Sequence, residues 1–236
     1  SMLRDDMIIG GTGFDLGVQL PEEIENIEPD YTFYDYPHNI GFAMRGCRFK
    51  CKFCVVPAKE GRPRSNSSIS KIWTQRTSDF LVLLDNDFFG NPDWRERIEE
   101  IKNFNLRVNF SQGINIRILT EEQAHALHSV RFRNLRGTHR TIHFAWDRFR
   151  DEKFILRGIN RCIDAGIKHY QMMFYILVGF DTSPAEDMYR IKLIRSLGCD
   201  PYVMPYDKKN TYQRKIARWV NHKAIFNSCT FDEYRA

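Results

Sequence analysis

Short apolar stretches alternate with amphipathic stretches from about residue 39 to residue 226. Six of the apolar stretches are rich in aliphatic and aromatic residues and lack strict apolar–polar alternation. This pattern is typical of strands that are buried on both faces. The predicted strands cover residues 40–44, 80–84, 106–110, 141–145, 171–178 and 201–204.

Helices are predicted between these strands from their start and stop signals. Thr120 with Gln123, and Ser183 with Glu186, form capping-box patterns, and Pro184 stands at the first helical position. Glycines 166 and 198 are typical helix ends. The predicted helices cover residues 92–104, a segment that begins at 121, and residues 152–165, 185–197 and 212–225.

Six strand–helix units in succession predict a parallel sheet with right-handed crossovers. Six units are too few for a complete eight-stranded barrel, so we expect an α/β fold built as an open partial (β/α)6 barrel of parallel strands. The length of 236 residues suits one such domain. We expect residues 38–236 to form it and residues 1–37 to form an N-terminal extension or lid.

Composition and charge narrow the class of protein. A hydrophobic content of 42% with 28% charged residues is ordinary for a soluble globular protein. No apolar run has the length of a membrane span, and no signal-peptide pattern is present. Three of the six cysteines are clustered and the others are scattered, unlike a secreted disulfide framework. We therefore expect a cytoplasmic protein without a membrane partner. The net charge of +5 mildly favours an anionic partner.

Three cysteines, Cys47, Cys51 and Cys54, have the spacing C-x3-C-x2-C directly after the first predicted strand. Thiolates this close together repel one another, so they persist only with a metal or in a disulfide. A disulfide leaves one cysteine over, whereas an iron–sulfur cluster uses all three. Such clusters normally take four thiolates, so three leave one iron open for another ligand. The alternative is a structural zinc site in which His38 is the fourth ligand.

This spacing, with the aromatic Phe53 just before the last cysteine, resembles the signature loop of the radical S-adenosylmethionine (SAM) enzymes. The resemblance covers about residues 35–226 and implies the partial-barrel fold of that family. It also implies that Cys47, Cys51 and Cys54 are the metal ligands of a catalytic 4Fe–4S cluster, whose open iron chelates the amino and carboxylate groups of SAM.

The reaction that the resemblance implies is the reductive cleavage of SAM. The reduced cluster passes one electron to SAM, which yields methionine and a 5′-deoxyadenosyl radical that takes a hydrogen atom from the substrate. Because cluster potentials can be as low as roughly −700 mV, a dedicated donor such as flavodoxin or ferredoxin is expected. The sequence leaves the second substrate open.

Further SAM contacts are expected at the carboxyl ends of the strands, where parallel βα folds place their sites. After the second strand, three polar residues replace the Gly-Gly-Glu stretch that the family often carries, and a carboxylate there suits the SAM ammonium. The later loops offer amides for the SAM carboxylate or ribose, an acid for ribose hydroxyls, and a glycine for close approach to adenine. Ordinary turn and loop polarity is the alternative. The predicted cofactor-binding residues are Phe53, Asp85, Asn86, Asp87, Gln112, Asn115, Asp147, Gly179 and Phe180.

Two groups of basic residues bear on the substrate. One consists of Arg131, Arg133, Arg136, Arg140, Arg148 and Arg150. The other consists of Lys208, Lys209, Arg214, Lys215, Arg218 and Lys223, interleaved with Tyr206, Tyr212 and Trp219. Such sets bind phosphates and stack bases, although a solvated helix face explains them as well.

Three functions are consistent with these patterns. The first is a radical SAM enzyme that acts on a nucleotide or nucleic acid base. The second is the same chemistry on a small metabolite or peptide. The third is a non-catalytic module with a zinc-stabilised loop and a basic face for nucleic acid.

Overall fold

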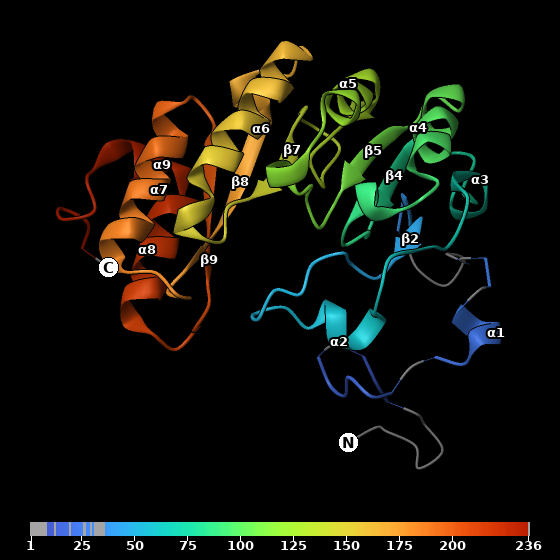
Figure 1. Cartoon of the computed structure of the whole chain (residues 1–236), viewed down its shortest axis with the longest axis horizontal. Helices are drawn as coiled ribbons and strands as arrows, with labels where there is room; N and C mark the ends of the chain where they lie inside the picture. The colour runs from blue at the N-terminus through green and yellow to red at the C-terminus, as the bar shows by residue number, and fades with distance from the viewer. Residues whose placement is uncertain are drawn as a thin grey trace.

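The structure is a computed structural model that describes residues 9–11, 13–18, 20–25, 27–28, 30 and 36–235 (Figure 1). Much of the extension predicted over residues 1–37 lies outside the described residues. The strands are β1 Asn39–Gly41, β2 Met44–Arg45, β3 Arg64–Ser65, β4 Phe80–Leu83, β5 Arg107–Phe110, β6 Arg131–Phe132, β7 Ile142–Ala145, β8 Met172–Val178 and β9 Asp200–Pro205. The α-helices are α1 Glu22–Glu25, α2 Val56–Glu60, α3 Ile69–Ile72, α4 Trp94–Asn103, α5 Glu121–Ser129, α6 Glu152–Asp164, α7 Pro184–Ser196, α8 Thr211–Asn221 and α9 Lys223–Ser228.

The strands form two parallel sheets that are joined by one bridge. The first sheet has the order β1-β4-β5-β6 and the second has the order β7-β8-β9. Beyond β5, the amide of Ile114 donates to the carbonyl of His143 at 2.8 Å, and Ile114 forms a parallel bridge with Phe144 of β7. Strand pairing therefore runs in chain order through β1, β4, β5, β7, β8 and β9. The predicted α/β class with parallel strands is confirmed.

All six predicted strands form, but the first differs from its prediction. The segment predicted as one strand over 40–44 splits, because β1 ends at Gly41 and Met44 starts β2, which pairs antiparallel with β3. Strands β2, β3 and β6 are two residues long, too short to show a period in the sequence. The single helix predicted over 212–225 is wrong, since His222 leaves the helical region and separates α8 from α9.

The predicted helix signals are confirmed at atomic level. The capping box of α5 has the Gln123 amide donating to Thr120 Oγ1 at 3.2 Å, and α7 has the Glu186 amide donating to Ser183 Oγ at 3.3 Å. Gly166 and Gly198 have φ of +100° and +74°, the left-handed conformation that ends a helix. The helix boundaries thus follow local chemistry.

The core lies between the helices and the sheets. All four residues of β4 are completely buried, and α6 buries Ile155 and Ile159. Figure 1 shows α4, α5 and α6 following one another along one side of the strands, with α2 on the other side. Along β8, burial alternates, so that Tyr175 and its neighbours on the helix-free face remain half-exposed. This open face is available to line a site.

Candidate functional site

The cysteine loop starts and ends at one clamp. The antiparallel pair β2–β3 brings its two ends together, and the Cys47 amide donates to the Gly61 carbonyl at 3.2 Å. Gly46 has φ of +81°, and a Cβ there would overlap the carbonyl of Arg62. A glycine is therefore required directly before the first cysteine.

The three thiols share a half-buried environment. All three cysteines are free, and the Phe49 amide donates to Cys47 Sγ at 3.5 Å. Burial raises the pKa of Cys47 to about 11, with smaller raising effects from the charges of Asp87, Cys51 and Cys54. Burial also raises the pKa of Cys51. The Cys47 and Cys51 thiols of the free protein therefore hold their protons at neutral pH, and a metal that binds them would release these protons.

The structure does not bring His38 to the cysteine loop. His38 lies just before β1, and its ring contacts that of Phe80, the first residue of β4, at 4.7 Å between centroids. It is therefore at the amino ends of these strands, whereas the cysteine loop follows a carboxyl end. Among the described residues, no group of three or more His, Cys, Asp or Glu side chains could hold a metal ion. This includes the three loop thiols, which the structure does not bring together as the ligands of one metal ion.

Asp87 secures the cysteine loop through Arg48. Its Oδ2 accepts from Arg48 Nε at 2.7 Å and from the Arg48 amide at 3.2 Å, and Oδ1 accepts from Nη2 at 2.8 Å. The side chain of Asp87 is only 3% exposed. This bidentate pair fixes the segment between the first two cysteines. Asp87 was predicted as a SAM contact, and the structure places its carboxylate on the protein itself.

Asp85 lies beneath the start of the loop. Its Oδ1 accepts from the amides of Ala43 at 2.8 Å and Met44 at 3.3 Å. Its Oδ2 is buried and has no hydrogen-bond partner among the residues that the structure describes. Burial raises the pKa of Asp85 to about 7, against the lowering effect of the two amides. This oxygen is an unsatisfied buried acceptor, which costs free energy unless a donor or a proton satisfies it.

The buried acid makes a pH-dependent contribution to stability. Between about pH 4 and pH 7 the folded protein keeps a proton on Asp85 that the unfolded chain has lost. The free energy of unfolding from this group therefore falls as pH rises, by at most about 1.4 kcal/mol per pH unit, and is constant above pH 7. Asp85→Asn should lack this contribution, because its amide is neutral and its oxygen still accepts the two amides.

Urea unfolding of both proteins across this pH range measures the effect. The stability difference, wild type minus Asp85→Asn, should become less favourable toward pH 7. Subtracting the two curves removes the contribution of other titrating groups, such as His143, whose pKa burial lowers. A difference that is constant with pH would contradict the assignment.

Glu60, which the sequence reasoning did not select, closes the loop from its far end. It is the last residue of α2, and its side chain is 12% exposed. Its Oε2 accepts from the Gly46 amide at 3.0 Å and from Asn86 Nδ2 at 3.3 Å, and its Oε1 accepts from Arg45 Nη1 at 3.3 Å. Asn86, predicted as a SAM contact, thus also binds this anchor. No sequence signal marks Glu60 beyond its position six residues after Cys54.

Glu60→Gln should weaken the loop. Three donors converge on Glu60, and glutamine replaces one acceptor oxygen with an NH2 group that faces them. We expect a loss of about 1–3 kcal/mol in the free energy of unfolding and a lower iron content after reconstitution. The matched control is Glu99→Gln, because Glu99 is an exposed acid on α4. Equal iron content and stability in both variants would rule out the anchoring role.

Residues after β5 and β7 reach the second cysteine. Arg117 forms an ion pair with Asp151 at 2.9 Å, and its Nε donates to Asn115 Oδ1 at 3.2 Å. Its guanidinium lies over the Phe49 ring, 5.2 Å from the ring centroid. The charges of Arg117 and Asp147 both act on the Cys51 thiol. The structure thus brings Asn115 and Asp147 toward the cysteine loop. Gln112 is exposed and makes no hydrogen bond with the described residues.

Asp147 has the environment of a functional acid. It is partly buried, and burial raises its pKa to about 6, although Arg117 and Arg190 lower it. The neighbouring Trp146 is completely buried and donates to the Arg148 carbonyl at 2.8 Å. Trp146 is therefore a core residue and cannot stack on a ligand, whereas Asp147 remains accessible.

Aromatic rings connect the cysteine loop with the ends of β8 and β9. The ring of Phe53 contacts that of Phe180 at 5.2 Å, and Phe180 contacts Tyr206 at 4.9 Å. Tyr206 is 53% exposed. Gly179 has φ of +77°, and a Cβ there would overlap the Gln213 amide of α8. The predicted residues Phe53 and Phe180 therefore meet, while Gly179 is required for packing against α8.

The two basic groups divide in space. Arg131, Arg133, Arg136 and Arg140 lie around the amino ends of the strands, whereas Arg148 is near Cys51 at the carboxyl ends. In the second group Trp219 is buried and donates to the Cys229 carbonyl at 3.0 Å. The expectation that this tryptophan stacks bases is wrong, because it belongs to the core under α8 and α9.

Comparisons with known proteins give limited information. No family model matches the chain. A CDK5RAP1-like protein from Oryza sativa subsp. japonica is 28% identical over 81 residues, which covers 31% of this chain. The match covers 14% of that protein, so the chain spans a small part of the length of this curated relative. Separately, the helices in the described part of the chain are all too short or too polar to cross a bilayer.

Proposed function

We propose that the protein is a radical SAM enzyme that cleaves SAM reductively at a 4Fe–4S cluster held by Cys47, Cys51 and Cys54. The observation that carries this proposal is the cysteine loop itself, clamped at the carboxyl end of a parallel strand with Phe53 against Phe180. The partial relative supports it, since CDK5RAP1-like is a name used within the radical SAM family.

The fold proposed with this function is a partial (β/α)6 barrel over residues 38–236, preceded by an extension over residues 1–37. Strand pairing in chain order from β1 to β9 supports it, as does the half-exposed, helix-free face of β8. In such a barrel the open face lines the site, and the cysteine loop closes one end of it.

The donor set fits the cluster. Three free thiols stand on one short loop, an amide donates to Cys47 Sγ, and Arg48 and Arg117 supply positive charge nearby. Amide bonds to sulfur and local positive charge stabilise reduced clusters. When bound, the cluster and SAM together supply the one-electron chemistry and the 5′-deoxyadenosyl radical.

The chain's own residues bind and orient SAM in this proposal. The orphaned Oδ2 of Asp85 suits the SAM ammonium, and the exposed amide of Gln112 and the partly buried amide of Asn115 suit its carboxylate or ribose. Asp147 suits the ribose hydroxyls, and the rings of Phe53 and Phe180 suit adenine. Asp87 and Asn86 hold the protein around this site.

The second substrate is proposed to be a nucleotide or nucleic acid base. Tyr206, with an exposed ring beside Phe180, and the neighbouring Lys208 and Lys209 suit a planar, phosphate-bearing substrate. The alternative is a small metabolite or peptide. An electron donor such as flavodoxin or ferredoxin completes the system, and the six free cysteines suit the reducing cytoplasm.

Anaerobic reconstitution with iron and sulfide tests the proposal. A brown protein that binds about four irons per chain and releases 5′-deoxyadenosine from SAM under dithionite is expected. A colourless protein that holds stoichiometric zinc would overturn the proposal. Removal of zinc with a chelator before reconstitution distinguishes a zinc-filled preparation, which then takes up iron, from a zinc protein, which does not.

A further inference from the structure

A cluster of arginines lies at the amino ends of the strands, the opposite end of the sheets from the cysteine loop. Arg107 and Arg131 are the first residues of β5 and β6. The other members lie in the loop that leads from β6 to β7. We name this cluster the arginine surface; it consists of Arg107, Arg131, Arg133, Arg136 and Arg140.

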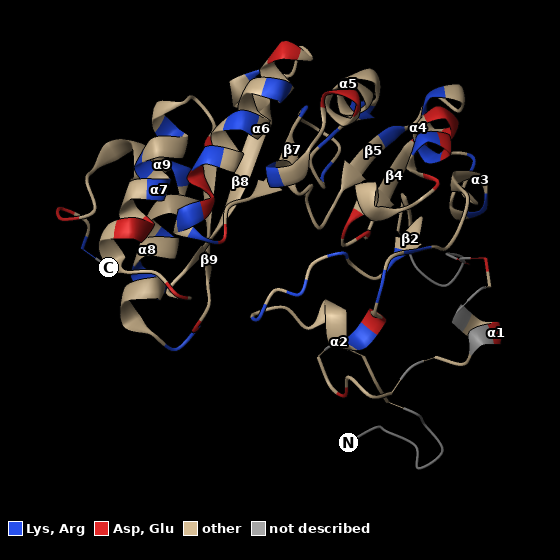
Figure 2. Cartoon of the chain, in the orientation of Figure 1, with Lys and Arg blue, Asp and Glu red and all other residues tan. Residues whose placement is uncertain are grey.

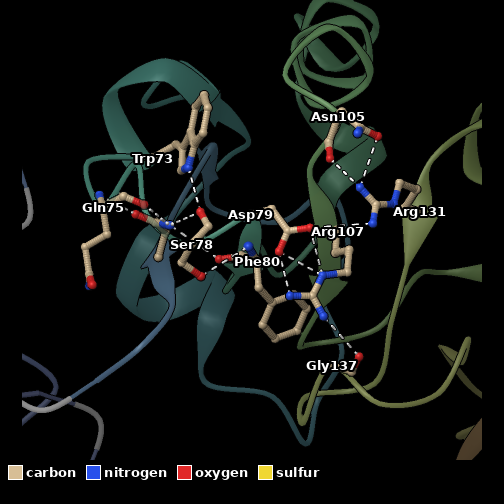
Figure 3. Close-up of polar contacts among 10 residues, drawn as sticks. Trp73, Gln75, Ser78, Asp79, Phe80, Asn105, Arg107, Arg131 and Gly137 are labelled. Carbon is tan, nitrogen blue, oxygen red and sulfur yellow. Dashed lines mark hydrogen bonds and ion pairs between the residues drawn. The ribbon is translucent and has the colours of Figure 1, made fainter.

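The arginine surface has far more positive than negative charge. Residues 131–140 contain four arginines and a histidine but no acid. Within the described chain, Asp79 is the carboxylate that pairs with this surface: it binds Arg107 at 2.5 Å and Arg131 at 3.5 Å (Figure 3). Arg133, Arg136 and Arg140 form no ion pair with any described acid.

Some arginines elsewhere in the described chain are paired with acids. Arg48, Arg95 and Arg117 each have their own carboxylate partner. Figure 2 shows basic and acidic residues together along α4 and α6. The arginine surface lies on strand ends and a connecting loop, and it is therefore not an ordinary solvated helix face.

Contacts with aromatic rings and a backbone carbonyl hold several side chains of the arginine surface in position. Arg107 lies over the Phe80 ring at 5.4 Å, and Arg140 lies over the Phe132 ring at 4.6 Å. Arg131 Nη1 donates to the Asn105 carbonyl at 2.7 Å (Figure 3). These contacts orient the guanidinium groups and reduce the entropy that a ligand would have to remove.

The loop that carries the other arginines is also ordered by its own bonds. Asn134 Oδ1 accepts from the Thr138 amide at 2.9 Å, and the Asn134 amide donates to the His139 carbonyl at 2.9 Å. Gly137, with φ of +71°, makes the turn, and its carbonyl accepts from Arg107 Nη1 at 3.4 Å. Arg136 and Arg140 are thus presented to solvent from a fixed loop.

The arginines of this surface repel one another, and a bound anion would reduce this unfavourable electrostatic energy. The pKa of Arg133 is lowered, first by burial and then by the charges of Arg131, Arg140 and Arg107. Guanidinium groups form paired hydrogen bonds with phosphate oxygens, and several of them in one plane suit a row of phosphates.

We propose that the arginine surface binds the phosphates of a single-stranded nucleic acid, one base of which reaches the candidate site. This inference rests on the proposed function. The four residues of β5 separate the two ends of the sheet by about 13 Å at 3.3 Å per residue, which exceeds the roughly 3.4 Å between successive phosphates along a duplex axis. A free nucleotide is too short to touch both. An unpaired strand suits the site because its bases are accessible.

Fluorescence anisotropy with a labelled single strand of about 15 nucleotides tests the proposal on the reconstituted protein. The double variant Arg136→Glu/Arg140→Glu should bind about tenfold more weakly, and its salt slope should fall by about 1.4 because two phosphate contacts are lost. The matched control is Lys153→Glu/Lys192→Glu, which makes the same charge change at exposed positions of α6 and α7. It should retain the wild-type affinity and slope.

Three outcomes would overturn the inference. They are equal affinity of the arginine variant and the wild type, an equal loss in the lysine control, and displacement of the strand by inorganic phosphate at the same phosphate concentration. Thermal unfolding confirms that the variants fold. Release of 5′-deoxyadenosine is measured in parallel and should be unchanged in both variants. A wild type that binds the strand without cleaving SAM would refute the proposed function but not the binding of nucleic acid by the arginine surface.

Discussion

Replacing Cys47, Cys51 or Cys54 with serine is expected to abolish the release of 5′-deoxyadenosine from SAM. Each thiol supplies one of the three ligands of the proposed cluster, and a serine hydroxyl stays protonated at neutral pH and is a poor ligand for iron. Two remaining thiols on one loop do not hold a cubane. The loss should exceed about a thousandfold, the level at which removal of a central catalytic group is usually seen.

Iron content, visible absorption and product release measure this prediction together. The matched control is Cys229→Ser, since Cys229 is free and partly buried but lies after α9, far along the chain from the loop. It should keep the iron and the activity of the wild type. Retention of four irons in any of the three loop variants would refute the assignment of that cysteine as a ligand.

The loop variants should change stability less than function. The clamp of the loop is made by β2–β3, Gly46, Glu60 and the Arg48–Asp87 pair, and none of these contacts uses a thiol. The free protein should therefore unfold at nearly the same urea concentration with serine at Cys51 as with cysteine. The hydrogen bonds and ion pair that hold the loop in place are therefore independent of the thiols that would bind the cluster.

The main elements of the fold could be predicted because their signals are local. Buried strands such as β4 form continuous apolar runs, and the caps at Thr120 and Ser183 lie next to the helices that they start. The two-residue strands and the break at His222 have no such signal. They depend on tertiary partners: β2 forms because β3 lies beside it, and the turn before β2 is bound by Asp85, which is 42 residues further on from Ala43.

In the candidate site, too, the local features could be predicted from the sequence and those that depend on tertiary contacts could not. The cysteine spacing is local and was sufficient to propose the chemistry, and the structure places the rings of Phe53 and Phe180 in contact. The acids after β4 could not be ranked from sequence, since only the structure shows that Asp87 is occupied by Arg48 and that one oxygen of Asp85 is orphaned. Trp219 was assigned to a basic face by its neighbours in sequence, but its own ring packs into the core.

The largest expected effect on stability comes from Arg190. This arginine on α7 is completely buried, and its Nη2 binds Asp187 Oδ1 at 2.6 Å. Its two terminal nitrogens also donate to the carbonyls of Trp146 at 2.6 Å and Leu177 at 2.7 Å. One side chain thus ties the helix to the carboxyl ends of β7 and β8, beside Asp147 and Gly179.

Arg190→Met is expected to lower the free energy of unfolding by about 3–5 kcal/mol. Methionine fills similar space, but it leaves the buried Asp187 carboxylate with only the Thr182 hydroxyl, which donates at 2.7 Å. Urea denaturation measures the loss. Lys192→Met, on an exposed face of the same helix, should stay within about 0.5 kcal/mol of the wild type.

A double-mutant cycle separates the charge pair from the carbonyl contacts. Asp187→Asn removes the carboxylate charge, so the combination Asp187→Asn/Arg190→Met should be more stable than the sum of the two single losses predicts, because no unpaired buried charge remains. Some loss should persist, since the carbonyls of Trp146 and Leu177 still lack their donor. Strictly additive losses would mean that Arg190 acts through these carbonyls alone. The strand ends that carry Asp147 and Gly179 would then be held by hydrogen bonds and not by the buried ion pair.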